Sequence, residues 1–139
     1  MWGVTPTRRL LISNLWIENE RGTPRRASSV VEWANYMAKT SREVGKDVAG
    51  DLFISTVFLG IDYNFVGFGP PILYETMIFA ESQIEGQWRY TSRQRAKRGH
   101  DSIVRALLAG VPVQDVYPDR RPSLTLIAGH RGVRKGQNA

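Results

Sequence analysis

Apolar and polar residues follow a strand-like pattern in several parts of this chain. Residues 51–59 and 72–80 are rich in β-branched and aromatic side chains and are apolar at both parities. Residues 10–20 alternate more loosely, and a short run at 87–90 follows a polar turn at 81–86. We therefore expect 51–59 to be a central strand and 51–59, 72–80 and 87–90 to form an antiparallel meander.

Two other segments carry the period of an amphipathic helix. Ser29 and Glu32 have capping-box spacing before apolar positions that continue to Val44, which predicts a helix over residues 30–45. Thr91 and Gln94 have the same spacing before a second helix that ends near Gly110. The apolar stripe of this second helix comprises Ala96, His100, Ile103, Val104, Leu107 and Leu108.

These elements predict an α+β fold in which an antiparallel meander sheet of three to five strands packs with two helices. The 139 residues suit a single domain, which we place at 1–128, with 123–128 as a candidate additional strand. Residues 129–139 are expected to form a flexible basic tail. No apolar run approaches the roughly 20 residues of a membrane span, so we expect a cytoplasmic protein without a membrane partner.

The composition of the chain excludes cysteine chemistry and disfavours a metal site. The chain has no cysteine, which excludes disulfides, thiolate metal ligands and cysteine nucleophiles. Its two histidines, His100 and His130, lack the spacing of a metal pair, so we expect no metal and no cofactor. The net charge of +6 favours anionic partners, and the basic excess lies in the last third of the chain.

A long connection, residues 60–71, contains three glycines, two prolines and the aromatic residues Tyr63, Phe65 and Phe68. Loops of this length often bind a ligand, and aromatic rings can stack on a base. The alternative is an aromatic cover over one end of the sheet. Both interpretations remain open, and Asp62 is a candidate acceptor for ribose hydroxyls in the first.

Glu75 stands in an apolar strand, where a carboxylate must be paired or protonated. Arg89 on the next strand is the natural cross-strand partner, and a general base or an acceptor for ligand hydroxyls is the alternative. His100, on the apolar side of the second helix, is expected to be a packed, hydrogen-bonded residue, with a ligand contact as the alternative.

The second helix also carries a basic stripe. Arg95, Arg98 and Arg105 share one face, and Arg93 and Lys97 border it. Guanidinium groups bind phosphates, so the stripe fits a nucleotide site, although a solvated helix face has the same appearance.

The strings STVFLGIDYNF (55–65), GPPILYETMIF (69–79), RYT (89–91) and Gly99-His100 resemble a family of small phage and prophage proteins. A helix such as VEWANYM (31–37) usually precedes them in that family, and the resemblance covers roughly residues 14–108. Tyr63 stands where the family string usually has His, which weakens any His-dependent catalysis at this loop.

The phage pattern is in turn similar to the Thoeris anti-defence sponge family, whose members sequester cyclic ADP-ribose-type signals without cleaving them. This resemblance implies a non-enzymatic homo-oligomer with ligand pockets between protomers. The candidate ligand-binding residues, taken from the chemistry of this chain, are Asp62, Tyr63, Phe65, Phe68, Glu75, Trp88, Arg89, Arg93, Arg95, Arg98 and His100. The alternatives are a basic nucleic-acid-binding protein and a virion-associated phage protein, while an enzyme using Glu75 or Asp62 with His100 is a weaker possibility.

Overall fold

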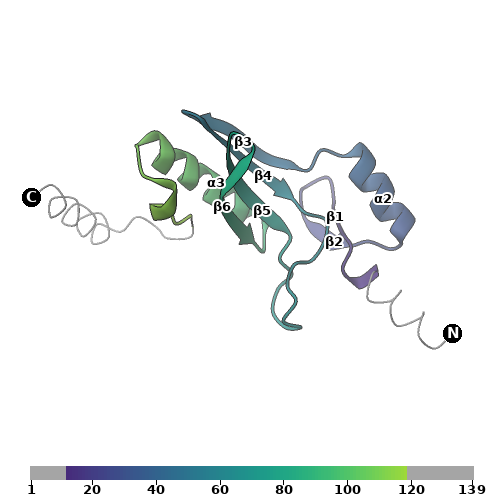
Figure 1. Cartoon of the computed structure of the whole chain (residues 1–139). Helices are drawn as coiled ribbons and strands as arrows, with labels where there is room; N and C mark the ends of the chain where they lie inside the picture. The colour runs from purple at the N-terminus through teal and green to yellow at the C-terminus, as the bar shows by residue number, and fades with distance from the viewer. Residues whose placement is uncertain (1–11, 119–139) are drawn as a thin grey trace, which may run out of the picture.

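The computed structural model describes residues 12–118 (Figure 1). Along the chain it contains β1 (Trp16–Glu18), β2 (Pro24–Arg26), α2 (Val30–Lys39), β3 (Glu43–Ala49), β4 (Leu52–Phe58), β5 (Tyr74–Ala80), β6 (Gln83–Tyr90), α3 (Arg93–Leu108) and a short 3₁₀ helix, η1 (Val113–Asp115). The described chain is therefore an α+β protein with antiparallel sheets and two main helices, as the sequence predicts.

The main sheet has the strand order β3-β4-β5-β6, with every neighbouring pair antiparallel. The strand predicted to be central, β4, lies between β3 and β5, so that expectation is confirmed. The β3–β4 hairpin turns at Gly50 with a φ of 61°, a conformation that glycine adopts at little cost. A smaller sheet pairs β1 with β2.

The prediction of one helix over residues 30–45 is wrong beyond Lys39. Thr40 has extended backbone angles, and residues 43–49 form the edge strand β3. Pairing with β4 satisfies the backbone groups of this segment, and a register shift between Glu43 and Gly45 marks a bulge. Val44, assigned from its spacing to the helical stripe, instead packs against the core cluster around Phe58 and Tyr74.

Several boundaries also differ from the sequence expectations. β6 starts at Gln83 rather than at 87, because the turn from β5 is made by Glu81 and Ser82 alone, both with positive φ. Ser92, not Thr91, caps α3, and its Oγ accepts from the Arg95 backbone N–H at 3.1 Å. Within the described part of this segment, residues 12–20, only Trp16–Glu18 forms a strand. The candidate strand at 123–128 and the tail at 129–139 lie outside the described residues.

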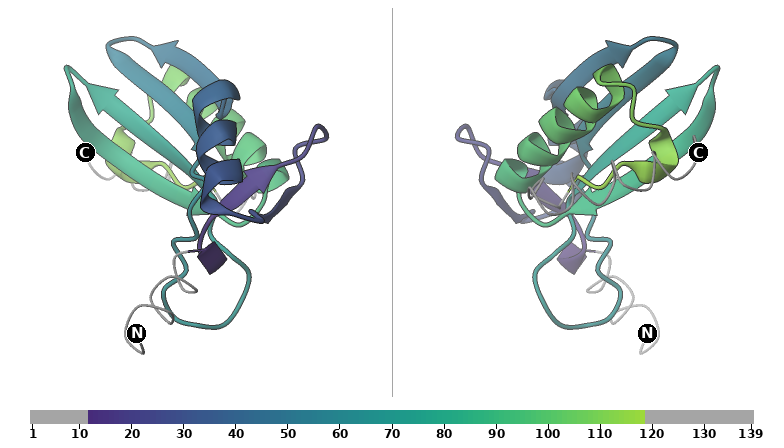
Figure 2. Two further views of the ribbon diagram at one scale, coloured as in Figure 1. Left: turned by 90° about the vertical axis from the view of Figure 1, so that its right-hand side faces the viewer. Right: turned by 90° about the vertical axis from the view of Figure 1, so that its left-hand side faces the viewer.

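The core lies between α3 and one face of the main sheet, which we call the inner face. α3 contacts all four strands, and Ile54, Tyr74 and Ile78 of the inner face are fully buried. Figure 2 shows α3 running across the strands, while α2 and the β1–β2 hairpin lie toward one end of the sheet. The opposite, outer face carries alternate residues of the same strands, and its apolar side chains remain partly exposed.

Candidate functional site

A cluster of predicted binding residues forms on the outer face where β5 and β6 meet the long loop. Glu75 and Arg89 are directly opposite in the register, and Arg89 Nε donates to Glu75 Oε2 at 2.9 Å. The Arg89 guanidinium also lies 4.4 Å from the centroid of the Tyr63 ring. The predicted cross-strand pair is therefore confirmed, and it is extended by an aromatic contact that the sequence pattern does not specify.

Glu75 is buried although it lies on the outer face, with a relative exposure of 6%. Gln87 Nε2 donates to the same carboxylate oxygen as Arg89, at 2.5 Å. Phe65 continues the cluster, because its ring centroid lies 5.8 Å from that of Tyr63. A guanidinium, a buried carboxylate and two aromatic rings thus lie close together at one end of the sheet.

The loop between β4 and β5 is ordered by hydrogen bonds from its own side chains. Asp62 Oδ1 accepts from the backbone N–H groups of Asn64 and Ile72, at 2.8 and 2.9 Å, which closes the base of the loop. Asn64 Nδ2 donates to the carbonyls of Phe68 and Pro70, both at 2.9 Å. Asp62 therefore orders the loop, and its Oδ1 already accepts two backbone hydrogen bonds.

Three large apolar side chains are exposed at the tip of this loop. Phe65, Val66 and Phe68 have relative exposures of 77%, 71% and 79%. The tip projects from the end of the sheet (Figure 1). The aromatic-cover interpretation accordingly does not describe Phe65 and Phe68 within the described chain, because neither ring is covered.

The remaining predicted site residues lie elsewhere. Trp88 points to the inner face, where it packs against both core clusters. Arg93 is engaged by Glu18. Arg95 and Arg98 are exposed on α3, across the sheet from Tyr63 and Arg89, so the structure does not bring the arginine stripe to the aromatic loop.

His100 is the centre of a buried polar chain. Its Nδ1 lies 2.7 Å from the Thr56 hydroxyl, and its Nε2 lies 2.7 Å from Asp47 Oδ2. The chain continues from Thr56 to Thr76 and then to the Tyr90 hydroxyl. His100 and Thr56 are fully buried, which confirms the expectation of a packed, hydrogen-bonded histidine.

This arrangement has the residue types of an acid, histidine and hydroxyl relay, but its histidine and hydroxyl are buried. A nucleophilic hydroxyl must reach a bound substrate, whereas Thr56 has a relative exposure of 0% and bonds to Thr76 at 2.5 Å. Gly45 and Gly99 allow the close packing, since a Cβ at either would lie 2.6 Å or less from His100 or Tyr90. The hydrogen bond between Asp47 and His100 joins β3 to α3.

A second buried network involves Glu18, at the end of β1. Tyr74 donates its hydroxyl to Glu18 Oε2 at 2.6 Å, and Arg93 Nη1 donates to both carboxylate oxygens at 3.0 and 3.2 Å. Burial raises the pKa of Tyr74 far above its ordinary value, and the hydrogen bond to Glu18 adds to this shift. Burial likewise raises the pKa of Tyr36.

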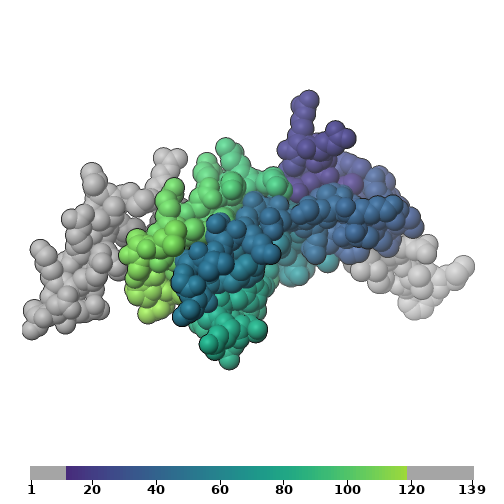
Figure 3. Space-filling model, turned by 90° about the horizontal axis from the view of Figure 1, so that it is seen from above, coloured from purple at the N-terminus to yellow at the C-terminus, as the bar shows by residue number. Residues whose placement is uncertain are grey.

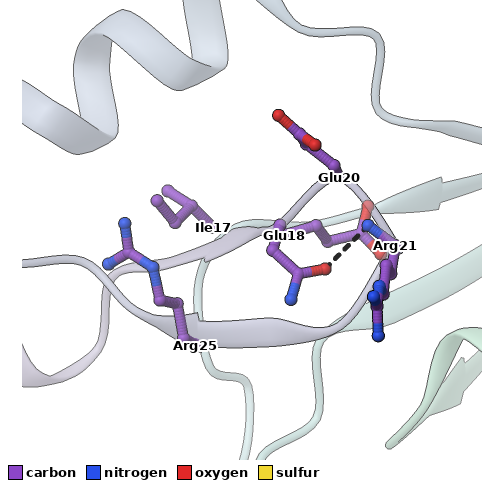
Figure 4. Close-up of a pocket in the computed structure, with 6 residues that line it drawn as sticks. Ile17, Glu18, Glu20, Arg21 and Arg25 are labelled. Atoms are coloured by element: carbon purple, nitrogen blue, oxygen red, sulfur yellow. Dashed lines mark hydrogen bonds between the residues drawn. The ribbon is translucent and has the colours of Figure 1, made fainter.

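A shallow hollow of about 420 Å³ lies beside this network on the β1–β2 hairpin. It is lined by Ile17, Glu18, Asn19, Glu20, Arg21 and Arg25. In Figure 4 the side chains of Arg21 and Arg25 lie on opposite sides of the hairpin and do not converge on one point. Arg25 is already bonded to Glu32, at 2.7 Å. The hollow therefore does not present a converging set of ligand groups.

Sequence reasoning did not identify Glu18 or Asp47 as members of polar networks. Asp47 was missed because the sequence predicted a helix over residues 30–45 and no strand between that helix and residue 51, so β3 and its pairing with β4 were not expected. The signal was the Gly50-Asp51 dipeptide, a hairpin turn sequence between two strand-like runs. Glu18 had no local signal, because its partner Arg93 is 75 positions away.

No family model, curated protein or solved structure matches this chain. Between residues 12 and 118, no helix has the length and apolar character needed to cross a membrane. The same part of the chain contains no group of three or more histidine or acidic residues arranged to hold a metal ion.

Proposed function

We propose that this chain is a non-enzymatic protein that binds a small nucleotide at the β4–β5 loop and β6. The observation that carries the proposal is the stack of the Arg89 guanidinium on Tyr63, 4.4 Å from the ring centroid, beside the exposed ring of Phe65. Aromatic faces next to a guanidinium are the groups with which proteins hold bases and phosphates.

The existing contacts of Arg89, Phe65 and Glu75 indicate the role that each would have in binding. Arg89 uses its Nε to bond Glu75, and its side chain is 40% exposed, so its terminal nitrogens are the phosphate donors. Phe65 offers an exposed ring for base stacking. Glu75 Oε2 already accepts from Gln87 and Arg89, which makes the carboxylate primarily an orienting group for Arg89. The fixed guanidinium then loses little rotamer entropy on binding.

The resemblance to the anti-defence sponge family extends this proposal to sequestration of a cyclic ADP-ribose-type signal in the cytoplasm of a phage-infected cell. Retention without cleavage is supported by the burial of Thr56, because its hydroxyl cannot reach a bound molecule. The protein then acts by mass balance and lowers the concentration of free signal.

Isothermal titration with cyclic ADP-ribose, and with AMP and ADP-ribose for comparison, tests this function. Phe65→Ala and Arg89→Lys should each weaken binding about tenfold or more, because they remove a stacking surface or a planar guanidinium. Arg95→Lys is the matched control and should leave the affinity unchanged. Mass spectrometry after heat release should recover the ligand intact. A wild-type protein that binds none of the three nucleotides, or that returns a hydrolysed product, would overturn the proposal.

A second function, nucleic-acid binding, is favoured by one separate observation. Arg95, Arg98 and Arg105 are exposed along one face of α3, whereas their neighbour Lys97 is engaged with Asp101 at 3.7 Å. Such a stripe would bind phosphates of a nucleic-acid backbone without sequence preference. Fluorescence anisotropy with a labelled 20-base-pair duplex at 50 and 200 mM salt is the test. Affinity should fall steeply with salt and weaken in Arg98→Ala, and the absence of binding at 50 mM would exclude this function.

A further inference from the structure

The outer face of the main sheet consists of three cross-strand rows. The first row is Val48, Phe53, Phe79 and Ile84, the second is Lys46, Ser55, Met77 and Gln87, and the third is Glu43, Val57, Glu75 and Arg89. The first row is apolar across all four strands of the sheet. The third row has opposite charges at its two ends, Glu43 on β3 and Arg89 on β6.

This face is not covered within the described chain. On the inner face Ile54, Phe58 and Ile78 are fully buried, whereas Val48 and Ile84 at the ends of the apolar row have relative exposures of 64% and 56%. Phe53 and Phe79, in the middle of the row, pack on each other with ring centroids 6.2 Å apart and remain partly exposed. A strand that is apolar at both parities normally has both faces covered.

The exposed loop tip belongs to the same side of the sheet. Its aromatic Tyr63 lies on Arg89, which is an outer-face residue, and the loop leaves from the two central strands, β4 and β5. Phe65, Val66 and Phe68 are thus an apolar extension beyond the end of the uncovered face. In Figure 3 the β3–β4 hairpin (blue) and the β5–β6 hairpin (teal-green) both reach the surface at the other end of the sheet.

We propose that the outer face binds a second copy of this chain, face to face, around a two-fold axis parallel to the strands. This operation reverses the strand order, so that β3 of one protomer faces β6 of its partner, and keeps each row opposite the same row. Apolar row then meets apolar row, with Val48 opposite Ile84 and Phe53 opposite Phe79. In the third row, Glu43 meets Arg89.

The alternative two-fold axis, perpendicular to the strands, is disfavoured by charge. It would place β3 on β3 and bring the two Lys46 side chains together at the β3 edge of the interface. Around the parallel axis, Lys46 instead lies opposite Gln87. Because the loops leave from the central strands, the same axis also brings the two loop tips to the same end of the interface.

The size of the face suits a stable dimer. Strands of seven residues in a four-stranded sheet cover about 24 Å by about 19 Å. Side chains that project from the sheet, together with the loop tip, enlarge this area toward the roughly 800 Å² per partner of a standard interface. The apolar row with a polar and charged border also has the anatomy of an interface.

Sedimentation velocity of the full chain without nucleotide tests the association. The wild type should sediment as a dimer of the 15.7 kDa chain. Val48→Lys and Ile84→Lys place charge in the apolar row and should each raise the dissociation constant at least tenfold. Glu43→Arg should also weaken the dimer, because it sets arginine against Arg89. Leu108→Lys is the matched control, since Leu108 is an equally exposed apolar residue on α3, at 66%.

Circular dichroism at the same concentrations shows whether each variant is folded. A wild type that stays monomeric at 100 µM overturns the proposal, as does a dimer that Leu108→Lys dissociates while the two row variants leave it intact. A cysteine-free chain allows a second test. Val66→Cys should form an interprotomer disulfide under mild oxidation, whereas Lys39→Cys on α2 should not, and the reverse result would place the interface elsewhere.

The proposed dimer and the proposed nucleotide site share Arg89, but the two are tested separately. Sedimentation uses protein without ligand, and the row variants leave Tyr63, Phe65 and Arg89 unchanged. A dimer that binds no nucleotide would contradict the proposed function but not the dimer. A monomer that binds nucleotide would contradict the inference about this face but not the proposed function.

Discussion

Arg93 and Glu18 form an ion pair that joins the start of α3 to the end of β1. Arg93 Nη1 lies 3.0 and 3.2 Å from the two carboxylate oxygens of Glu18, whose side chain is 5% exposed. Gly22, with a φ of 77°, makes room for the arginine, because a Cβ there would lie 2.7 Å from Arg93 Cδ. This pair attaches the β1–β2 hairpin to the rest of the molecule.

Replacing Arg93 should therefore strongly destabilise the fold. Arg93→Met keeps most of the aliphatic stem but removes the cationic partner of the buried Glu18 carboxylate, to which Tyr74 still donates. We expect a loss of about 3–5 kcal/mol in the free energy of unfolding, which urea titration measures. Arg95→Met, on the exposed face of the same helix, should change it by less than about 0.5 kcal/mol. Equal effects of the two substitutions would contradict the assigned role of Glu18.

The hydrogen-bonded chain through His100 predicts that substitutions at the adjacent residues Thr56 and Ser55 have different effects on folding stability. Thr56→Val keeps the shape of the side chain but removes the hydroxyl that bonds His100 Nδ1 and Thr76, at 2.7 and 2.5 Å. Leaving buried polar atoms without partners should cost about 1–3 kcal/mol of folding stability. Ser55→Ala on the outer face is the control and should cost less. Thermal denaturation of both variants decides the matter, and a Thr56→Val protein as stable as wild type would refute it.

The ion pair between Glu32 and Arg25 predicts a pH-dependent contribution to stability. Arg25, at 2.7 Å, and the Ser28 backbone N–H lower the pKa of Glu32 from 4.5 to about 2. A depressed folded-state pKa stabilises the protein above the unfolded value, and this contribution disappears as the pH falls from 4.5 to about 2. Glu32→Gln should therefore lower the Tm at pH 7 and converge with wild type near pH 2.

The magnitude will be small because the pair is exposed to solvent. Glu85→Gln, at an exposed position on β6, is the control for loss of one negative charge. NMR titration of the Glu32 side chain measures the pKa directly. A midpoint at or above 4.5 would show that Arg25 does not hold the carboxylate in solution.

The loop tip should lose its order when its internal hydrogen bonds are removed. Asn64→Ala deletes the two bonds from Nδ2 to the carbonyls of Phe68 and Pro70, and one from the Val66 N–H to Oδ1. We expect amide exchange at residues 65–69 to accelerate at least tenfold while the Tm changes little. Asn35→Ala, on the exposed side of α2, should leave loop exchange unchanged. Unaltered exchange in Asn64→Ala would mean that other contacts order the tip.

Local pattern was sufficient for several features. Two apolar strands joined by a long loop predict the β4–β5 pair. Arg89 was the expected partner of Glu75, but the register that sets the two residues opposite each other comes from the sheet. The buried state of His100 follows from its place on the apolar stripe of α3. The helix from residue 30 was also predictable, because Ser29 caps it through the N–H of Glu32 at 3.1 Å.

The end of that helix was not predictable from spacing, since residues 43–49 become a strand only by pairing with β4. The same holds for the binding cluster. The residue types at positions 63, 75 and 89 were visible in the chain, but the contact of Arg89 with Tyr63 depends on how the loop folds back over β6. Periodicity reports which side of an element a residue occupies. Contacts between distant elements, such as Glu18 with Arg93 or Asp47 with His100, depend on tertiary packing. These interactions form only when the helices and strands that carry the two residues pack together.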